Sequence, residues 1–452
     1  MTSNSLAFAV RFSNINTFWE VRSVRISLTN RSFWKTVPLG SVCKVRSDIV
    51  PSSQLETGKV KMLDRISFDE GKVHFGNRTQ TKMTQYRAMS GDIVVSKINA
   101  RKRAIGIVPN ETEVGLTIHF RALTADKSQA DTQFLWLALR SDFCKNQFDV
   151  ETGGMGKGEI SEERLLSIKA PLPPLNTQRA VVSRWHSAQH FAAQAKDKII
   201  ETEKAIEKKF FADLGLKLPS HSQNPKAFAA HWKDFERWSV SYNQAILTSV
   251  DISRGKYAVT EFRDILSMVQ YGTSEKANEK GLGVPVLRIN NVKKGGLDLS
   301  DLKHIPLQEK TRENLLIKDG DILIIRTSGS RDLVGTCAVF HETQKYVFAS
   351  YLIRLRVDSA KANPDYVAWL INSRIGRQQI DALSRQIMQN NINSQELRSL
   401  KLPLPPLKAQ QEIIDHVESG RAEIARQKQL AEKIRKDSEA KIEALILGTK
   451  KI

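Results

Sequence analysis

Long apolar runs and clustered cysteines are both missing from this chain of 452 residues. No stretch approaches the roughly 20 apolar residues that a membrane helix needs, and the run from Leu6 to Val10 is too short for the core of a secretory signal. The cysteines stand singly, without a Cys-x-x-Cys pair or a histidine at zinc spacing, at Cys43, Cys144 and Cys337. These absences argue against a membrane protein and a structural zinc site, and they predict a reduced, cytoplasmic setting.

Motifs that mark enzymes are incomplete. Asn363-Pro364-Asp365-Tyr366 is close to the Asn-Pro-Pro-Tyr sequence that holds a flipped adenine in amino-methyltransferases, but Asp365 replaces a proline and no Phe-x-Gly-x-Gly methyl-donor loop is present. We interpret this peptide as a helix start, with Pro364 at an early position. The glycine-rich stretch 153–158 lacks the Ser or Thr that a nucleotide-binding loop needs after its lysine. The nine histidines are scattered, so we predict neither catalytic residues nor a metal site.

Positive charge is what the chain has in excess. It carries 69 Lys and Arg residues against 49 Asp and Glu residues, a net charge of +20. Such an excess indicates a polyanionic partner, with nucleic acid as the leading candidate. Charge by itself is weak support, because ribosome-associated and membrane-surface proteins share it.

One peptide occurs twice. Pro-Leu-Pro-Pro-Leu stands at 171–175 and at 403–407, and each copy is followed three residues later by a glutamine, Gln178 or Gln410. A nearly equal shift relates Gly91-Asp92-Ile93 to Gly320-Asp321-Ile322. The sequence therefore predicts the duplication of a whole domain together with the segment that follows it.

Two kinds of sequence alternate along the chain. Short apolar runs separated by Gly, Asn, Asp and basic turns predict strand-rich units at about 34–170 and 260–402. Within them, 134–139 and 366–371 look like the starts of amphipathic helices, so each unit is expected to be α+β.

The segments after the two junctions have apolar residues at alternating steps of four and three, which is typical of a coiled-coil seam. The seam positions are Val181, Trp185, Ala188, Ala192, Ile199 and Ile206 in the first segment, and Ile413, Val417, Ile424 and Ile434 in the second. We predict that the two helices pack on each other, each a rod of about 50 Å for roughly 35 residues. The alternative is that each apolar stripe packs against its own globular domain.

Taken together, the chain resembles the specificity (S) subunit of type I restriction-modification enzymes. The resemblance rests on the two Pro-Leu-Pro-Pro-Leu-x-x-Gln junctions, the helices after them and the Gly-Asp-Ile strands, and it spans almost the whole chain. The family's usual Glu before the glutamine is replaced by Thr177 and Ala409. We expect this departure to alter a contact at the helix start and not the assignment.

The resemblance implies two tandem-repeated α+β target recognition domains, each reading one half of a split sequence in double-stranded DNA. Two long helices forming an antiparallel coiled coil would separate them. The expected divisions are 1–175 for the N-terminal region and first recognition domain, 176–215 for the central spacer helix, 216–402 for a linker and the second recognition domain, and 403–452 for the C-terminal spacer helix.

The resemblance also implies partners. Two methyltransferase (M) subunits and restriction (R) subunits would dock on this chain, and S-adenosylmethionine, ATP and Mg²⁺ would be bound by those partners and not by this chain.

Reading DNA requires base-edge donors and acceptors on loops, and cations for phosphates. In the first domain the candidates are Lys97, Asn99, Arg101, Lys102, Arg103 and Lys157. In the second they are Arg288, Asn290, Asn291, Lys293, Lys294, Arg326, Ser328, Ser330, Arg331, Gln389 and Asn390. An ordinary solvated charge is the alternative for each single residue, and capping or turn formation is the alternative for the amide-rich segment 386–393.

Two other functions remain open at this point. A stand-alone DNA-binding or scaffold protein with a coiled-coil spacer would also explain the repeat, and a DNA-modifying enzyme would explain the charge. Unchanged DNA affinity after charge reversal in the Arg101 to Arg103 turn would indicate a scaffold whose globular domains bind protein, and activity without partners would reveal the modifying enzyme.

Overall fold

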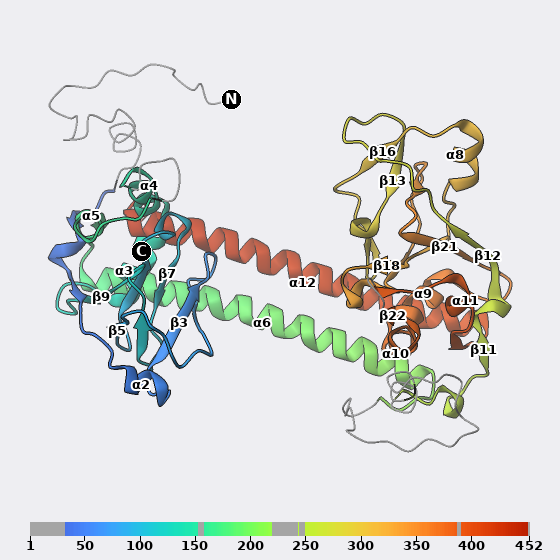
Figure 1. Cartoon of the computed structure of the whole chain (residues 1–452), viewed down its shortest axis with the longest axis horizontal. Helices are drawn as coiled ribbons and strands as arrows, with labels where there is room; N and C mark the ends of the chain where they lie inside the picture. The colour runs from blue at the N-terminus through green and yellow to red at the C-terminus, as the bar shows by residue number, and fades with distance from the viewer. Residues whose placement is uncertain (1–31, 152–157, 219–242, 244–248, 387–389, 451–452) are drawn as a thin grey trace. The chain divides into compact units, whose positions relative to one another are not determined.

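The computed structural model describes residues 32–151, 158–218, 243, 249–386 and 390–450. They form two compact units, which Figure 1 colours by position along the chain. The first unit combines residues up to Lys196 with those from Gln429 onward, and the second consists of Asp197–Lys428. Each unit therefore contains one end of each of two long helices.

A four-stranded antiparallel sheet lies at the centre of the first unit, with the strand order β2-β9-β6-β7. Its strands are β2 (Cys43–Arg46), β6 (Ile93–Ser96), β7 (Ile105–Ile107) and β9 (Phe120–Ala125). Strand β6 is buried on both faces, because Ile93 and Val95 belong to one apolar core and Val94 to another. A continuous apolar run is what such a strand requires.

A second sheet completes this domain, with the order β4-β3-β8-β5 and a parallel pairing between β3 and β8. Its strands are β3 (Lys61–Ile66), β4 (Val73–Phe75), β5 (Tyr86–Ala88) and β8 (Val114–Leu116). The domain's helices are α2 (Ser52–Glu56), α3 (Thr132–Arg140), α4 (Asp142–Glu151) and α5 (Glu162–Ser167), with 3-10 turns η2 (Leu39–Ser41) and η3 (Ala100–Lys102). Phe134 and Leu135 of α3 pack in the same core as Ile93.

The second unit repeats this plan. Its central sheet has the order β12-β21-β17-β19, all antiparallel. The strands are β12 (Leu266–Tyr271), β17 (Ile322–Ile325), β19 (Cys337–Val339) and β21 (Leu352–Val357). Strand β17 is again buried on both faces, since Ile322 and Ile324 lie in one core and Leu323 and Ile325 in another.

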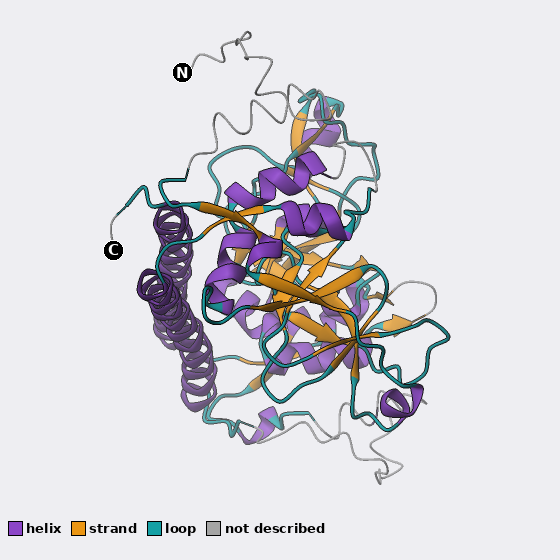
Figure 2. Ribbon diagram, turned by 90° about the vertical axis from the view of Figure 1, so that its left-hand side faces the viewer, coloured by secondary structure: helices purple, strands orange, loops and turns teal. Residues whose placement is uncertain are grey.

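Smaller elements surround this sheet. The strands are β13 (Val284–Leu287), β14 (Val292–Lys293), β15 (Gly296–Leu297), β16 (Lys303–Ile305), β18 (Thr327–Ser328), β20 (Val347–Phe348), β22 (Arg385–Gln386) and β23 (Asn390–Asn391). The helical elements are η5 (Ile252–Arg254), η6 (Phe262–Ile265), η7 (Ile289–Asn291), α8 (Glu309–Leu315), η8 (Arg331–Leu333), α9 (Pro364–Asn372), α10 (Arg374–Leu383) and α11 (Ser394–Arg398). Helix α9 begins at Pro364 with Asn363 as its N-cap, which confirms the predicted helix start. Figure 2 distinguishes helices from strands and illustrates the α+β class.

Each junction peptide ends a short strand and then begins a long helix. Strand β10 (Lys169–Pro171) pairs with β1 (Thr36–Pro38), and β24 (Lys401–Pro403) pairs with β11 (Val259–Glu261), both antiparallel. The helices that follow are α6 (Leu175–Asp213) and α12 (Leu407–Leu447), visible in Figure 1. The prolines between strand and helix interrupt both hydrogen-bonding patterns, so the chain changes direction there.

The two long helices run antiparallel. In the first unit, Val181 near the start of α6 shares a core with Leu445 near the end of α12. In the second unit, Phe210 near the end of α6 shares a core with Ile413 near the start of α12. At the helix ends the apolar stripe therefore packs both against the other helix and against the globular core, so both predicted arrangements occur there.

All the predicted seam residues are buried or partly buried. Val181, Ile206, Ile413 and Val417 are buried, while Trp185, Ala188, Ala192, Ile199, Ile424 and Ile434 are partly buried. A close approach of the helices occurs at Gly420, where an added Cβ would lie 2.5 Å from the Ile206 side chain. None of the helices in the described part of the chain is long and apolar enough to cross a membrane.

Candidate nucleic-acid interface

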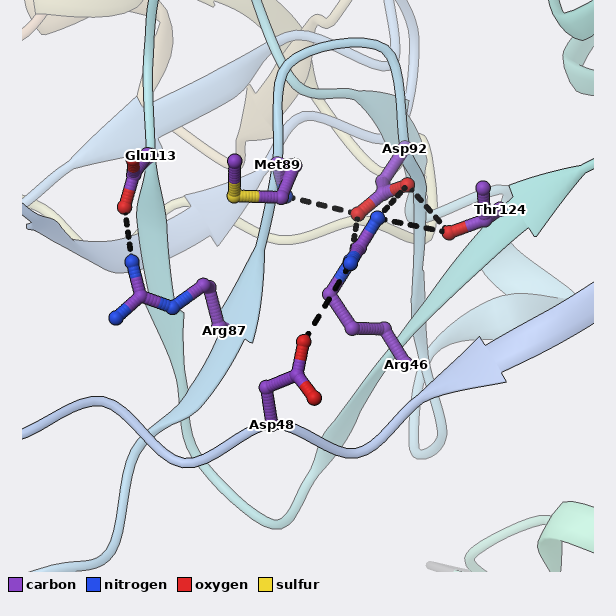
Figure 3. Close-up of polar contacts among 7 residues, drawn as sticks. All are labelled: Arg46, Asp48, Arg87, Met89, Asp92, Glu113 and Thr124. Carbon is purple, nitrogen blue, oxygen red and sulfur yellow. Dashed lines mark hydrogen bonds and ion pairs between the residues drawn. The ribbon is translucent and has the colours of Figure 1, made fainter.

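The Gly-Asp-Ile motif of the first domain forms a tight turn before β6. Gly91 has φ +84°, a conformation that a side chain would strain. The buried carboxylate of Asp92 accepts hydrogen bonds from the Met89 backbone N–H at 2.8 Å, from Arg46 Nε at 2.7 Å and from Thr124 Oγ1 at 2.7 Å, as Figure 3 shows. The aspartate is therefore a structural residue that fixes where β6 begins.

The second domain has the same turn. Gly320 has φ +78°, and the buried Asp321 accepts from the Lys318 backbone N–H at 2.8 Å. Its arginine partner comes from a different strand, since Arg356 of β21 donates to Asp321 at 2.6 and 2.9 Å. In both domains the motif thus begins a buried central strand, β6 or β17, and the predicted basic cluster lies in the turn at the other end of that strand.

The turn after β6 is fixed by two backbone hydrogen bonds. The Lys97 N–H donates to the carbonyl of His119 at 2.8 Å, and its carbonyl accepts from the Ile160 N–H at 3.0 Å. The Lys97 ammonium lies 3.2 Å from a Glu159 carboxylate oxygen and donates to the Ile118 carbonyl at 3.3 Å, leaving the side chain 13% exposed. The charge of Lys97 is therefore engaged within the domain.

The remaining candidates of this turn differ in exposure. Asn99 is the N-cap residue of η3, and Arg101 is partly buried. Arg103 adopts φ +64° and pairs with Asp142 at 2.7 Å. Lys102 is the exposed cation, with its ammonium 5.6 Å from the Phe68 ring centre.

The turn after β17 is held in the same way. The Arg326 N–H donates to the carbonyl of Tyr351 at 3.0 Å, and its carbonyl accepts from the Ile392 N–H at 2.9 Å. Its guanidinium stacks on Tyr271, with Cζ 4.9 Å from the ring centre. This position corresponds to Lys97, but its side chain has a different environment.

Two clusters that are far apart in the sequence come together beside Arg326. Strand β23 pairs with β18, placing Asn390 opposite Ser328. Ser330 donates its backbone N–H to Ser328 Oγ at 3.1 Å, and the exposed Arg331 donates to the Asp381 carbonyl at 3.0 Å. The β18-β23-β22 ribbon therefore joins the basic turn to the amide-rich segment.

Capping explains part of that amide-rich segment. The Asn393 side chain caps α11, completing a capping box with Glu396. The backbone of Asn390 lies in the ribbon and its side chain is only 8% exposed. The predicted candidates Lys157 and Gln389 lie outside the described residues.

A third cluster surrounds η7 and the β14–β15 hairpin. Arg288 bonds to the carboxylate of Asp301 at 2.9 Å. Asn291 is 1% exposed and uses its amide to hold its own loop, accepting from the Arg288 N–H and donating to the Asp298 and Asp301 carbonyls. In this geometry Asn291 cannot present its amide to a base, whereas Asn290, Lys293 and Lys294 are exposed.

The glutamine of each junction peptide was noticed in the sequence, and the structure shows that it has a structural role. Gln178 is fully buried, and its Oε1 accepts from the Asp131 backbone N–H at 2.8 Å. Its Nε2 donates to the carbonyls of Pro173 at 2.8 Å and Gln129 at 3.1 Å. Since Asp131 is the N-cap of α3, one side chain ties the start of α6 to the helical layer of the recognition domain.

Gln410 makes the equivalent set of bonds in the second domain. It accepts from the N–H of Asn363, the N-cap of α9, at 2.7 Å and donates to the carbonyls of Pro405 and Lys361 at 2.7 and 3.2 Å. A second duplicated glutamine was missed: Gln147 and Gln379 each clamp the backbone of the lysine in the last strand, Lys169 or Lys401. The shift of 232 residues that relates the two Pro-Leu-Pro-Pro-Leu peptides also relates this pair and could have revealed it.

One cavity of about 670 Å³ opens near the first basic turn. Its lining includes Arg65 and His74, but three acidic residues outnumber them, namely Asp64, Asp69 and Glu70. Carboxylates oppose the approach of a phosphate backbone, so the cavity does not extend the basic surface. The described residues contain no group of three or more His, Cys, Asp or Glu side chains that could hold a metal ion.

Comparison with known proteins identifies the family. The family described as "Type I restriction modification DNA specificity domain" matches residues 32–202 and again residues 256–436. The EcoKI specificity subunit of Escherichia coli strain K12 is 23% identical over 378 residues, which cover 82% of this chain and 74% of that protein. The StySPI specificity subunit of Salmonella potsdam is 31% identical over 149 residues, covering 32% of each.

A solved structure has the same fold. It comes from work on complex assembly and conformational transition of the type I restriction-modification system, and it superposes with a TM-score of 0.58 at 16% identity, covering 91% of this chain and 97% of that chain. The chain therefore belongs to the type I restriction modification DNA specificity family, as a specificity subunit with two copies of the family's domain.

Proposed function

We propose that this chain recognises a bipartite target in double-stranded DNA, with one half-site bound by each domain. The observation that carries the proposal is the duplicated turn: Lys97 and Arg326 occupy equivalent backbone positions, each fixed by the same pair of hydrogen bonds. Each turn lies beside exposed cations, Lys102 in the first domain and Arg331 in the second. Cations of this kind contact phosphates, while neighbouring polar groups read base edges.

The candidate contacts now divide into two groups. Side chains that are exposed or open to solvent remain proposed DNA contacts: Asn99, Arg101, Lys102, Asn290, Lys293, Lys294, Arg326, Ser328, Ser330 and Arg331. Those whose polar groups are engaged within the domain, or whose side chain is buried as in Asn390, are proposed to shape the surface: Lys97, Arg103, Arg288, Asn291 and Asn390. Lys157 and Gln389 remain proposed contacts, because each lies three residues before the isoleucine that bonds to its domain's basic turn.

We further propose that α6 and α12 set the gap between the half-sites. At 39 and 41 residues, each helix is about 60 Å long at about 1.5 Å per residue. Their first and last turns pack in the domain cores, so only the middle part would act as a spacer. The divisions at about 175, 215 and 402 are proposed on the same basis.

The helices are also the proposed docking site for two methyltransferase subunits, through which restriction subunits join the complex. Support comes from apolar side chains that the helices leave exposed, namely Phe191 at 56%, Ile200 at 40% and Leu430 at 44%. Apolar side chains that are exposed on a helix surface are available for burial by a protein partner. S-adenosylmethionine, ATP and Mg²⁺ are proposed to bind to those partners in the cytoplasm, and no catalytic step is assigned to this chain.

Co-purification of the full chain with its methyltransferase subunit, followed by mapping of methylated adenines, tests this function. We expect methylation within a sequence of two specific parts separated by a gap of fixed length. A continuous, unsplit recognition sequence would contradict the spacer role of the helices. Methylation or cleavage by the chain alone would contradict the assignment of catalysis to partners.

A further inference from the structure

Arg326 of the second domain is a partly buried cation with no counterion among the described residues. Its guanidinium carbon lies 4.9 Å from the centre of the Tyr271 ring, and its buried Nε has no hydrogen-bond partner. Over the described residues, no carboxylate lies within ion-pair distance of it. Leaving a charged donor unpaired in a partly buried position costs free energy, so this arrangement is costly in the free protein and suited to accepting a ligand.

The Tyr271 ring lies against the guanidinium of Arg326 and is itself anchored by a hydrogen bond. It is the last residue of β12, and its hydroxyl accepts a hydrogen bond from the backbone N–H of Ser394, the first residue of α11, at 3.1 Å. The backbone of Arg326 is fixed on both sides, by Tyr351 and Ile392. The anchored ring and the two backbone hydrogen bonds therefore restrain the position of the guanidinium before any DNA arrives.

The equivalent position of the first domain lacks this arrangement. Lys97 has the same two backbone hydrogen bonds, but its ammonium is engaged by Glu159 and by the Ile118 carbonyl. Arg326 presents a planar fork of donors, whereas Lys97 presents a single ammonium whose charge is already paired. The cation of the duplicated turn is therefore paired with a carboxylate in the first domain, whereas in the second domain the described residues offer it no carboxylate.

The groups beside Arg326 are those that base recognition uses. Ser328 lies two residues along the chain and opposite Asn390 in the ribbon. Asn391, the next residue of β23, has a buried Oδ1 that finds no hydrogen-bond partner in the described part of the chain. A fixed guanidinium next to hydroxyl and amide groups matches a base edge better than a phosphate, because bidentate contact to guanine O6 and N7 depends on the orientation of the fork.

We propose that Arg326 reads a guanine in the half-site bound by the second domain, that Tyr271 is its positioning residue, and that Lys97 makes no base contact in the first domain. This inference rests on the proposed function, because it names a contact within that function. It predicts that the two halves of the target respond differently to substitutions at equivalent positions.

Selection from a random duplex DNA library tests the inference, using the full chain in complex with its methyltransferase subunit. The unchanged complex should enrich a two-part motif. We expect Arg326→Ala to lose the base preference at one or two positions of one half while the other half stays unchanged, and to bind the originally enriched duplex roughly tenfold or more weakly. Arg326→Lys should keep the charge without restoring the preference, because it lacks the fork.

Variants of Tyr271 separate positioning from folding. Tyr271→Phe keeps the ring under the guanidinium and should retain the motif, whereas Tyr271→Leu removes the ring and should relax the same positions as Arg326→Ala. Lys97→Met tests the other part of the inference at the equivalent backbone position, and a lost base preference at a position of the first half-site would overturn it. Lys127→Met, beyond the opposite end of β9, is the control and should leave both halves of the motif unchanged. Co-purification with the methyltransferase subunit reports folding for each variant, and Arg326→Lys serves if Arg326→Ala fails to assemble.

The outcomes distinguish this inference from the proposed function. If the unchanged complex enriches no two-part motif, the proposed function fails. If that motif appears and survives intact in both Arg326→Ala and Arg326→Lys, the inference alone is overturned. A uniform loss of affinity with a shallower salt dependence and an unaltered motif would assign Arg326 to a phosphate, which also overturns base reading.

Discussion

Replacing Gln178 by alanine removes the side chain that ties α6 to the recognition domain. Its amide makes three hydrogen bonds from a fully buried position, one to the Asp131 N–H and two to the carbonyls of Pro173 and Gln129. The substitution leaves these backbone groups without their partner. We therefore expect the cost to come from unsatisfied polar groups, with a smaller contribution from the cavity.

The magnitude follows from those groups. A buried donor or acceptor left unpaired costs about 1–3 kcal/mol, and water that enters the vacated space recovers part of it. We expect Gln178→Ala to lower the free energy of unfolding by about 3 kcal/mol. Gln178→Glu should be no milder, because its second carboxylate oxygen would face the two carbonyls that the amide N–H₂ now satisfies.

Urea unfolding followed by far-ultraviolet circular dichroism measures this change. Gln410→Ala is the matched variant, because Gln410 makes the corresponding three bonds in the second domain. Gln194→Ala, at an exposed position on α6, is the control and should stay within about 0.5 kcal/mol. A loss below about 1 kcal/mol for both buried glutamines, or no difference from Gln194→Ala, would refute the reasoning.

Three further changes give measurable outcomes. Val181→Asp places a carboxylate in the core shared by α6 and α12. It should lower the free energy of unfolding by at least about 3 kcal/mol and abolish co-purification with the methyltransferase subunit. The control Ser187→Asp, at an exposed position of the same helix, should do neither. Lys102→Glu should weaken DNA binding and make the plot of log K against log salt shallower by about one unit, while Lys127→Glu, beyond the opposite end of β9, should have a smaller effect; equal effects would contradict the role of the turn. Burial alone would lower the pKa of His341, but its hydrogen bonds to Asp319 and Asp365 outweigh burial and raise the pKa above 6.5. The stability from these contacts should be complete below pH 6.5 and be lost as the pH rises through the raised pKa, so a stability difference between the native chain and His341→Ala that grows with rising pH would contradict it.

Periodic patterns made the long helices and the central strands predictable. The alternating four-three spacing after each junction identifies a helix stripe, because it depends only on residues close in sequence. The continuous apolar run at Ile322–Ile325 likewise indicates a strand buried on both faces. The Gly-Asp-Ile repeat marked both strand starts, although the buried role of the aspartates became clear only with the arginines that bond to them.

Contacts between distant segments were not predictable. Strand β18 has only two residues, and its pairing with β23 brings Ser328 to Asn390 without any apolar pattern. The charge of Lys97 is neutralised by Glu159, and the amide of Asn291 is used by its own loop. Sequence composition marks such side chains as polar, but only the folded chain decides which of them still have free donors and acceptors.

Because the last turns of α12 belong to the core of the first domain, we expect that domain to finish folding only after the whole chain is made. Ile442, Leu445 and Ile446 complete the core of the first domain, so that core stays open until these residues leave the ribosome. The second domain draws its core from residues no later than Ile414, and it can close earlier although it is made later. Since domains generally fold in the order of synthesis, a premature stop within the final turns of α12 would leave a finished second domain attached to an unfinished, aggregation-prone first one.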